Sequence, residues 1–146
     1  MRAVMLMLLT AASWAGEIFG VWKLNPARST LAPEQKGLTL RIEPHTRGEV
    51  FTVDALAADG RASTLITILY FDGKARQYQD SGCSGTQLSR RLDSQTVEIV
   101  RNCDSGAWTR FVRRLTTRSL LILDITAQQT DGRQVERRLV LEKNKE

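Results

Sequence analysis

Apolar side chains recur at every second position through most of this chain, and this alternation restricts the fold more than any other feature. Residues 38–43 read Leu-Thr-Leu-Arg-Ile-Glu, and residues 51–55 read Phe-Thr-Val-Asp-Ala. A period of two sends successive side chains to opposite faces of a β-strand. After residue 15, no segment shows a sustained helical period, apart from a short turn at residues 26–29. The pattern therefore predicts an all-β protein.

The second half of the chain shows the same alternation in regularly spaced segments. Strands are predicted at Thr86–Leu92, Gln95–Asn102, Ala107–Thr116, Ser119–Gln128 and Arg133–Lys143. The segment Ser63–Phe71 is apolar at both odd and even positions, which is typical of a strand that is covered on both faces. We therefore expect this strand in the centre of the sheet.

Turn signals separate these segments and indicate how the strands connect. Asp-Gly pairs occur at residues 59–60, 72–73 and 131–132, and Asp-Ser pairs begin at residues 93 and 104. Asp-Gly is favoured in tight hairpin turns, because glycine has no Cβ and tolerates a positive φ. Short links join neighbouring strands in antiparallel fashion, so the turns predict a meander.

A meander of eight to ten strands has two exposed edges, and closure into a barrel removes both. A two-sheet sandwich would need longer crossovers, whereas the only long link spans residues 25–37. A transmembrane barrel would carry aromatic girdles, and only 6% of the residues are aromatic. The predicted fold is an antiparallel up-and-down meander closed into an eight- to ten-stranded β-barrel.

The N-terminal stretch indicates export. Arg2 precedes an apolar run over residues 3–12, and residues 13–15 have the small-x-small pattern that signal peptidases accept. The run is shorter than the roughly 20 residues that span a bilayer, so no integral membrane association is expected. We predict a signal peptide at residues 1–15, one barrel domain at residues 16–146, and a secreted or periplasmic location.

Five short motifs are spread over the rest of the chain. They are Gly20–Ser29, Leu38–Pro44, Ala58–Gly60, Tyr70–Lys74 and Thr130–Arg133. Together they resemble the motifs of small exported bacterial proteins that are lipocalin-like and largely uncharacterised. The resemblance implies a lipocalin-like, calycin-type barrel, and it brings no activity or ligand with it.

The Gly-x-Trp motif at residues 20–22 implies one structural pair. In lipocalins, the tryptophan of this motif packs at the closed end of the barrel beneath an arginine from a late strand. By resemblance, Trp22 takes the first role. Arg137 shares its strand face with the apolar residues at 135, 139 and 141, so Arg137 is the expected cation over the indole ring.

The two cysteines predict a disulfide. Cys83 and Cys103 lie ten positions before and ten positions after Asp93. If the flanking strands form a hairpin that turns near Asp93, the two thiols face each other at its open end. An even pair of cysteines in an exported chain is expected to be oxidised. Neither a Cys-x-x-Cys motif nor a complete metal-ligand set is present, so we expect no redox catalysis and no bound metal.

The chain offers little for catalysis or nucleic-acid binding. His45 is the only histidine, no Gly-x-Ser-x-Gly motif occurs, and Asp54 and Asp124 are isolated aspartates within predicted strands. The net charge of +5 is spread along the chain, without a concentrated basic patch among exposed aromatics. We expect neither an enzyme nor a cofactor, and no nucleic-acid partner.

Two functions follow from a barrel of this kind. The first is a binding module whose lumen holds a small apolar or amphipathic molecule, with Tyr70, Trp108 and Arg110 as candidate lining residues. The sequence leaves open which face of the 107–116 strand points inward. The second is a non-enzymatic structural or interaction protein of the cell envelope, whose barrel is filled with side chains.

Overall fold

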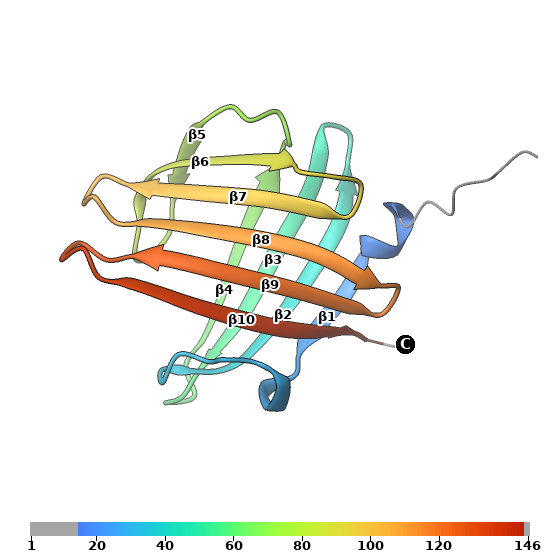
Figure 1. The fold of residues 1–146 in the computed structure, drawn as a ribbon, viewed down its shortest axis with the longest axis horizontal. Coiled ribbons are helices and arrows are strands. Elements are labelled where there is room, and N and C mark those ends of the chain that lie inside the picture. Colours follow the sequence, from blue (N-terminus) through green and yellow to red (C-terminus); the bar gives the residue numbers. More distant parts are fainter. Residues whose placement is uncertain (1–14, 145–146) are drawn as a thin grey trace, which may run out of the picture.

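The computed structural model describes residues 15–144 as ten β-strands and two short 3₁₀-helices (Figure 1). The elements are η1 (Ala15–Ile18), β1 (Gly20–Leu24), η2 (Pro26–Arg28), β2 (Gln35–His45), β3 (Gly48–Ala57), β4 (Ala62–Leu69), β5 (Arg76–Gln79), β6 (Ser84–Arg91), β7 (Thr96–Cys103), β8 (Trp108–Thr117), β9 (Leu120–Gln128) and β10 (Gln134–Lys143). Except for Ala15, the predicted signal peptide lies outside the described residues. Within residues 15–144, no helix is long and apolar enough to cross a membrane.

All ten strands form one antiparallel sheet in the order β4-β3-β2-β1-β10-β9-β8-β7-β6-β5. The first and last strands pair with each other, and Trp22 of β1 lies opposite Lys143 of β10. The sheet curls so that β1–β4 and β6–β10 face one another as two layers whose strands cross (Figure 1). The predicted all-β, up-and-down meander is therefore confirmed, with ten strands.

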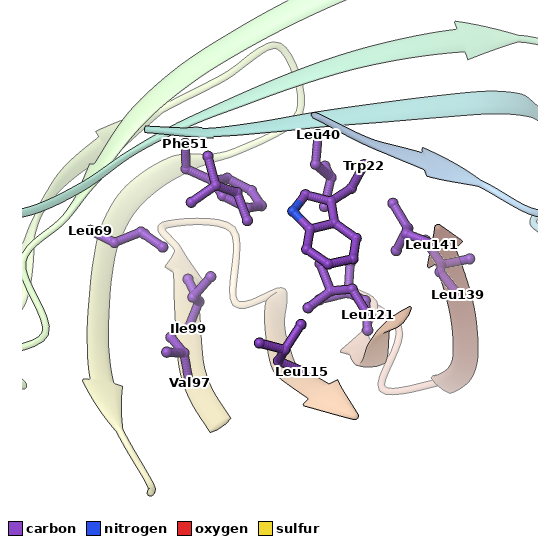
Figure 2. Close-up of a cluster of buried hydrophobic side chains, with 12 residues drawn as sticks. Trp22, Leu40, Phe51, Leu69, Val97, Ile99, Leu115, Leu121, Leu139 and Leu141 are labelled. Carbon is purple, nitrogen blue, oxygen red and sulfur yellow. The ribbon is translucent and has the colours of Figure 1, made fainter. Parts of the chain in front are cut away.

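The apolar core fills one end of this barrel, which we call the closed end (Figure 2). Its buried members come from eight of the strands: Trp22, Leu40, Ile42, Phe51, Leu69, Val97, Ile99, Leu115, Leu121, Leu123, Leu139 and Leu141. Trp22 is fully buried, and its indole Nε1 donates a hydrogen bond to the carbonyl of Ile18 in η1 at 2.9 Å. A buried tryptophan removes about 150–250 Å² from water, which stabilises the fold by about 5 kcal/mol as an upper value.

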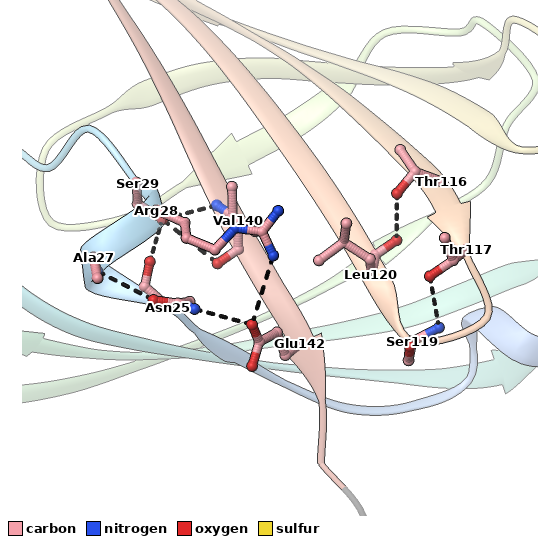
Figure 3. A network of polar contacts seen from close by, with 10 residues as sticks. All are labelled: Asn25, Ala27, Arg28, Ser29, Thr116, Thr117, Ser119, Leu120, Val140 and Glu142. Carbon is pink, nitrogen blue, oxygen red and sulfur yellow. Dashed lines mark hydrogen bonds and ion pairs between the residues drawn. The ribbon is translucent and has the colours of Figure 1, made fainter.

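The link between β1 and β2 is fixed against β10 (Figure 3). Asn25 caps η2 by accepting from the backbone N–H of Ala27 at 3.1 Å, and its side-chain amide donates to Glu142 at 2.9 Å. The hydroxyl of Ser29 accepts from the backbone N–H of Val140 at 2.8 Å. These contacts fix the first half of the link against β10.

The seam between β4 and β5 is the one place in the described sheet where consecutive strands share no hydrogen-bonded ladder. Side chains bridge it instead, because Gln87 Nε2 donates to Thr67 Oγ1 at 3.0 Å and the backbone N–H of Phe71 donates to Ser89 Oγ at 3.0 Å. Phe71 has a φ of 56°, which is uncommon for a residue other than glycine. The seam is therefore held by a few polar contacts and a strained turn.

Most predicted strands are confirmed, with two exceptions at the seam. The strand predicted at Ser63–Phe71 is found as β4, but its expected central position is wrong, because β4 is the end strand of the sheet. Its outward face carries Ile66, whose exposed fraction is 65%. The four-residue strand β5 was not predicted, because Arg76–Gln79 is too short and too polar to show a clear period. Gly60 and Gly132, of two predicted Asp-Gly turns, have φ of 88° and 85°, as expected.

Candidate ligand-binding site

An apolar cavity of about 200 Å³ lies inside the barrel, next to the closed-end core. Its lining consists of inward-facing residues from the middle of the strands: Gln35, Leu38, Leu40, Phe51, Val53, Leu65, Ile99, Arg101, Phe111, Leu123, Ile125 and Leu139. Only Gln35 and Arg101 among them are polar. The closed end is thus filled with side chains, whereas the rest of the lumen contains free space.

A larger hollow of about 530 Å³, which we call the mouth, opens at the opposite end of the barrel. It is lined by Ala32, Glu34, Gln35, Ala55, Leu56, Ala57, Arg61, Ala62, Ser63 and Arg137. Gln35 borders both the cavity and the mouth, so the two spaces meet at this side chain. The fixed link between β1 and β2 supplies Ala32 and Glu34 to the rim.

Arg101 is the charged group of the inner cavity. It lies on β7, where it shares the inward face with Val97 and Ile99. Its Nε donates to the side-chain carbonyl of Gln87 at 2.8 Å, and its guanidinium carbon lies 4.9 Å from the centre of the Phe111 ring and 4.5 Å from that of Tyr78. Burial lowers the pKa of this guanidinium below its usual value, although arginine remains charged at neutral pH.

No carboxylate of residues 15–144 forms an ion pair with Arg101. Asp80 is close enough for its charge to influence Arg101, but its carboxylate accepts from the Tyr78 hydroxyl at 2.5 Å and from the Gly82 N–H at 2.7 Å. Burial is the main reason that the pKa of Tyr78 is raised, and the bond to Asp80 adds to it. Burial alone would raise the pKa of Asp80, but its hydrogen bonds and the charge of Arg101 outweigh burial and lower it.

The predicted disulfide between Cys83 and Cys103 is present. Cys103 follows Arg101 by two residues on β7, and the carbonyl of Cys83 accepts from the N–H of Asp80 at 2.8 Å. The bond therefore joins the turn that carries Asp80 to the strand that carries Arg101. The hairpin of β6 and β7 turns near Asp93, as predicted from the spacing.

The expected pairing of Trp22 with Arg137 does not occur. The cation over the Trp22 ring is Lys143, whose Nζ lies 5.5 Å from the ring centre. Arg137 does face inward, but it lies opposite Ile125 and lines the mouth, at the other end of β10. Strand parity identified the correct face of β10. Which inward residue of β10 lies next to Trp22 depends on the register between β10 and β1, and strand parity does not determine that register.

Trp108 and Arg110 lie on the outer face of β8 and do not line the lumen. Phe111 of the same strand lines the cavity, so the even-numbered residues of β8, including Trp108 and Arg110, point outward. Arg110 instead forms an ion pair with Glu98 at 2.6 Å, and Arg90 binds the same carboxylate at 2.7 Å. Both hydrogen bonds lower the pKa of Glu98 although burial opposes them. The prediction that these two residues line the lumen is therefore wrong.

Tyr70 lies outside the lumen, at the seam. Its ring is covered by the guanidinium of Arg76, 3.9 Å from the ring centre, and by that of Arg47 at 5.1 Å. The only histidine, His45, meets the edge of the same ring with a centroid distance of 6.3 Å. Tyr70 thus belongs to a surface groove and does not contact the inner cavity.

The isolated aspartates of the sequence have local partners. Asp54 accepts from the Thr64 hydroxyl at 2.6 Å, and Asp124 forms an exposed ion pair with Arg138 at 2.7 Å. Within the described residues, no three His, Cys, Asp or Glu side chains are grouped as a metal ligand set. Asp54 and Asp124 are thus bound locally, and neither lines the inner cavity.

Arg101 and Tyr78 were missed as site residues in the sequence. The signal for Arg101 was available, because Val97, Ile99 and Arg101 share one face of a predicted strand. Tyr78 could not have been found in this way, since β5 itself was not predicted.

Three solved structures of similar fold put the barrel in context. A fatty acid binding protein of Schistosoma mansoni in complex with arachidonic acid matches with a TM-score of 0.63 and 11% identity, covering 90% of this chain and 98% of that one. The wild-type fluorescent protein UnaG matches with a TM-score of 0.59 and 15% identity, covering 89% of this chain and 99% of that one. A redesigned β-barrel, mFAP1, bound to DFHBI matches with a TM-score of 0.52 and 11% identity, covering 91% of this chain and 100% of that one.

These likenesses show that the chain shares its antiparallel β-barrel fold with these structures. No protein-family model and no curated protein sequence matches the chain.

Proposed function

We propose that this protein binds a small amphipathic anion inside its barrel. The apolar part of the ligand occupies the cavity of about 200 Å³, and its acidic group pairs with Arg101. The observation that carries the proposal is the position of Arg101, a charged side chain that lines a mainly apolar cavity and forms no ion pair with a carboxylate of residues 15–144. The free space in the lumen speaks against a barrel that is filled with side chains.

The energetics favour an anionic group at this position. Removing a guanidinium from water costs free energy unless a partner restores its interactions. In the described structure Gln87 and two aromatic rings compensate only in part, since a neutral amide and a cation–π contact are weaker than a charge-assisted pair. A carboxylate or a similar planar anion would supply the missing charge.

The size of the site favours a compact ligand. Pockets for drug-sized molecules hold about 300–1,000 Å³, and the inner cavity lies below that range. A longer ligand would extend into the mouth, where Arg61 and Arg137 face it. The structural neighbour bound to arachidonic acid supports a fatty-acid-like ligand class for this chain, with a shorter tail.

We further propose that binding takes place outside the cytoplasm. The apolar leader with its cleavage pattern and the disulfide both support export, because disulfides persist in oxidising compartments. Mass spectrometry of the chain recovered from the medium or periplasm of an expressing bacterium tests this. A mature N-terminus at Gly16 is expected, and a full-length chain retained in the cytoplasm would contradict export.

The ligand is tested by titrating the oxidised, delipidated protein with straight-chain carboxylates of six to fourteen carbons. Each added CH₂ contributes about 0.8 kcal/mol on burial, so affinity should rise about fourfold per carbon until the cavity is full, and then level off. Alcohols of matched length should bind about tenfold more weakly.

Arg101→Met should abolish the preference for the carboxylate over the alcohol. The matched control is Arg110→Met, on the outer face of the adjacent strand, which should leave both affinities unchanged. Equal affinity for acid and alcohol in the unmodified protein would refute the role of Arg101. Saturable binding of neither series would refute the proposed function.

A further inference from the structure

The free edges of β4 and β5, the two end strands of the sheet, border a groove on the outside of the barrel. This groove has a volume of about 380 Å³, and we call it the seam groove. Ile66 and Ile68 of β4, together with Tyr70 just after this strand, form its apolar wall, and Lys74 and Arg76 form its basic wall. It is separate from the inner cavity, with which it shares no lining residue.

The edge of β4 is unusually open to pairing. Exposed edge strands are normally protected by charged residues, proline or β-bulges. The eight residues Ala62–Leu69 contain no charge and no proline, and their pairing with β3 shows no register shift. Within the described sheet, β3 is the only strand that pairs with β4. Ile66 of this strand is more exposed than any other large hydrophobic residue of the described chain.

The polar contacts of the seam close only one end of the groove. Thr67 is bonded to Gln87, and Phe71 is bonded to Ser89, at the end nearer the turn into β5. No backbone hydrogen bond of the described chain joins residues 62–66 to β5. Main-chain donors and acceptors along this half of β4 therefore have no strand to bind them, and Ile66 brings this free edge to the seam groove.

The charges around the groove are predominantly positive. The ring of Tyr70 lies between the guanidinium groups of Arg76 and Arg47, and Lys74 stands beside them. Asp72 neutralises Arg76 through two hydrogen bonds, of 2.7 and 2.6 Å. Neither Arg47 nor Lys74 forms an ion pair with any described carboxylate. The unmatched charge thus belongs to cations on the rim of an apolar surface.

We propose that the seam groove binds an extended, acidic segment of a partner protein by adding it as a strand to the edge of β4. In this mode, main-chain hydrogen bonds supply affinity and alternate side chains supply specificity. Apolar side chains on one face of the segment contact Ile66 and Ile68, and carboxylates farther along the same face meet Lys74 and Arg47 beside Tyr70. A second copy of this chain fits less well, because edge-to-edge pairing would bring two basic grooves together.

The test uses a fluorescein-labelled peptide of the sequence Glu-Thr-Glu-Thr-Val-Thr-Val-Thr, which places two glutamates and two valines on one face of a strand. Its binding is followed by fluorescence anisotropy at low salt. We expect saturable binding with a Kd of about 10–100 µM, and binding about tenfold weaker for the matched valine–lysine peptide. Lys74→Glu should weaken binding of the acidic peptide about fivefold, whereas Lys23→Glu, on the exposed face of β1, should change it less than about twofold. Equal binding of the two peptides, or no binding up to about 1 mM, would overturn the proposal.

Main-chain pairing has its own test. Two further peptides carry N-methyl groups on the threonines only, or on the valines and glutamates only, which blocks the amides along one edge of the added strand. At least one of them should lose binding by more than about tenfold. If both bind as well as the parent, strand addition is refuted. Sedimentation of the protein alone gives the remaining outcome, since a dimer that Ile66→Lys dissociates would assign the edge to a second copy.

Discussion

Two arginines on adjacent strands point into the same barrel, and their surroundings differ in one respect. Arg113 of β8 lies near the closed end and is 2% exposed, opposite Glu49 of β3, which is 1% exposed. Its Nη2 donates to Glu49 Oε1 at 3.1 Å, and Nη1 lies 2.8 Å from Oε2 in a geometry too bent for a second hydrogen bond. Arg101 of β7 has an amide and two aromatic rings, but no carboxylate.

The difference separates a structural charge from a binding charge. Glu49 and Arg113 lie on opposite walls of the barrel and neutralise each other's charge, so the closed end needs no further ion. Arg101 is held in place by Gln87 and by the rings of Tyr78 and Phe111, while its charge stays unmatched. Functional sites commonly retain groups that lower the stability of the fold, such as a partly buried charge without a counter-charge, and the rest of the fold offsets this loss of free energy.

The largest effect is expected when the closed-end pair is broken. Glu49→Gln leaves the buried Arg113 charge without a counter-charge and should lower the free energy of unfolding by about 3–5 kcal/mol, measured by urea denaturation. Replacing both partners, Glu49→Leu with Arg113→Met, should recover most of that loss, because no buried charge then remains. The exposed pair of Asp124 and Arg138 is the control, and Asp124→Asn should cost less than about 1 kcal/mol. A similar small cost for Glu49→Gln would contradict the assignment.

The second effect concerns the disulfide, which supports the half of the barrel that the core does not fill. Replacing Cys83 and Cys103 by serine should lower the free energy of unfolding by about 3 kcal/mol, since the bond closes a loop with a sequence separation of 20 residues. Ligand affinity should fall as well, because the bond fixes the turn of Asp80 beside Arg101. Calorimetry of the variant, and of the native chain with and without reductant, measures both. Lower stability with unchanged affinity would show that the turn does not position the site.

The third prediction contrasts Arg101 directly with Arg113. Arg101→Met should change the free energy of unfolding by less than about 1 kcal/mol, because the lost cation–π contacts are balanced by the removal of a half-buried, unmatched charge. Gln87 then keeps its bond to Thr67 at the seam. Arg113→Met, by comparison, should be as destabilising as Glu49→Gln. If both arginine variants lose several kcal/mol, the distinction between the two charges fails.

The same contrast shows how far the sequence could predict this molecule. Alternation and Asp-Gly turns were sufficient for the meander, and the spacing around Asp93 was sufficient for the disulfide, because these depend on contacts between neighbouring strands. The pair of Glu49 and Arg113 joins residues 64 positions apart across the lumen, and no local pattern indicates it. The partner of Trp22 was misassigned for a related reason. The register between β1 and β10 is set by packing of the whole barrel rather than by either strand.

The smallest effect is a change in acid sensitivity at Asp80, a carboxylate whose charge acts on Arg101. Its pKa lies below the ordinary value of 3.8, because its hydrogen bonds from Tyr78 and Gly82 and the charge of Arg101 outweigh burial. A carboxyl with a lowered folded-state pKa stabilises the fold above its unfolded pKa, and this contribution is lost as the pH falls through the folded value. Asp80→Asn should therefore lose less free energy of unfolding than the native chain between about pH 5 and about pH 2 in urea titrations. An identical loss in both proteins would mean that the pKa of Asp80 is the same in the folded and the unfolded chain. The charge of Arg101 would then not stabilise the Asp80 carboxylate.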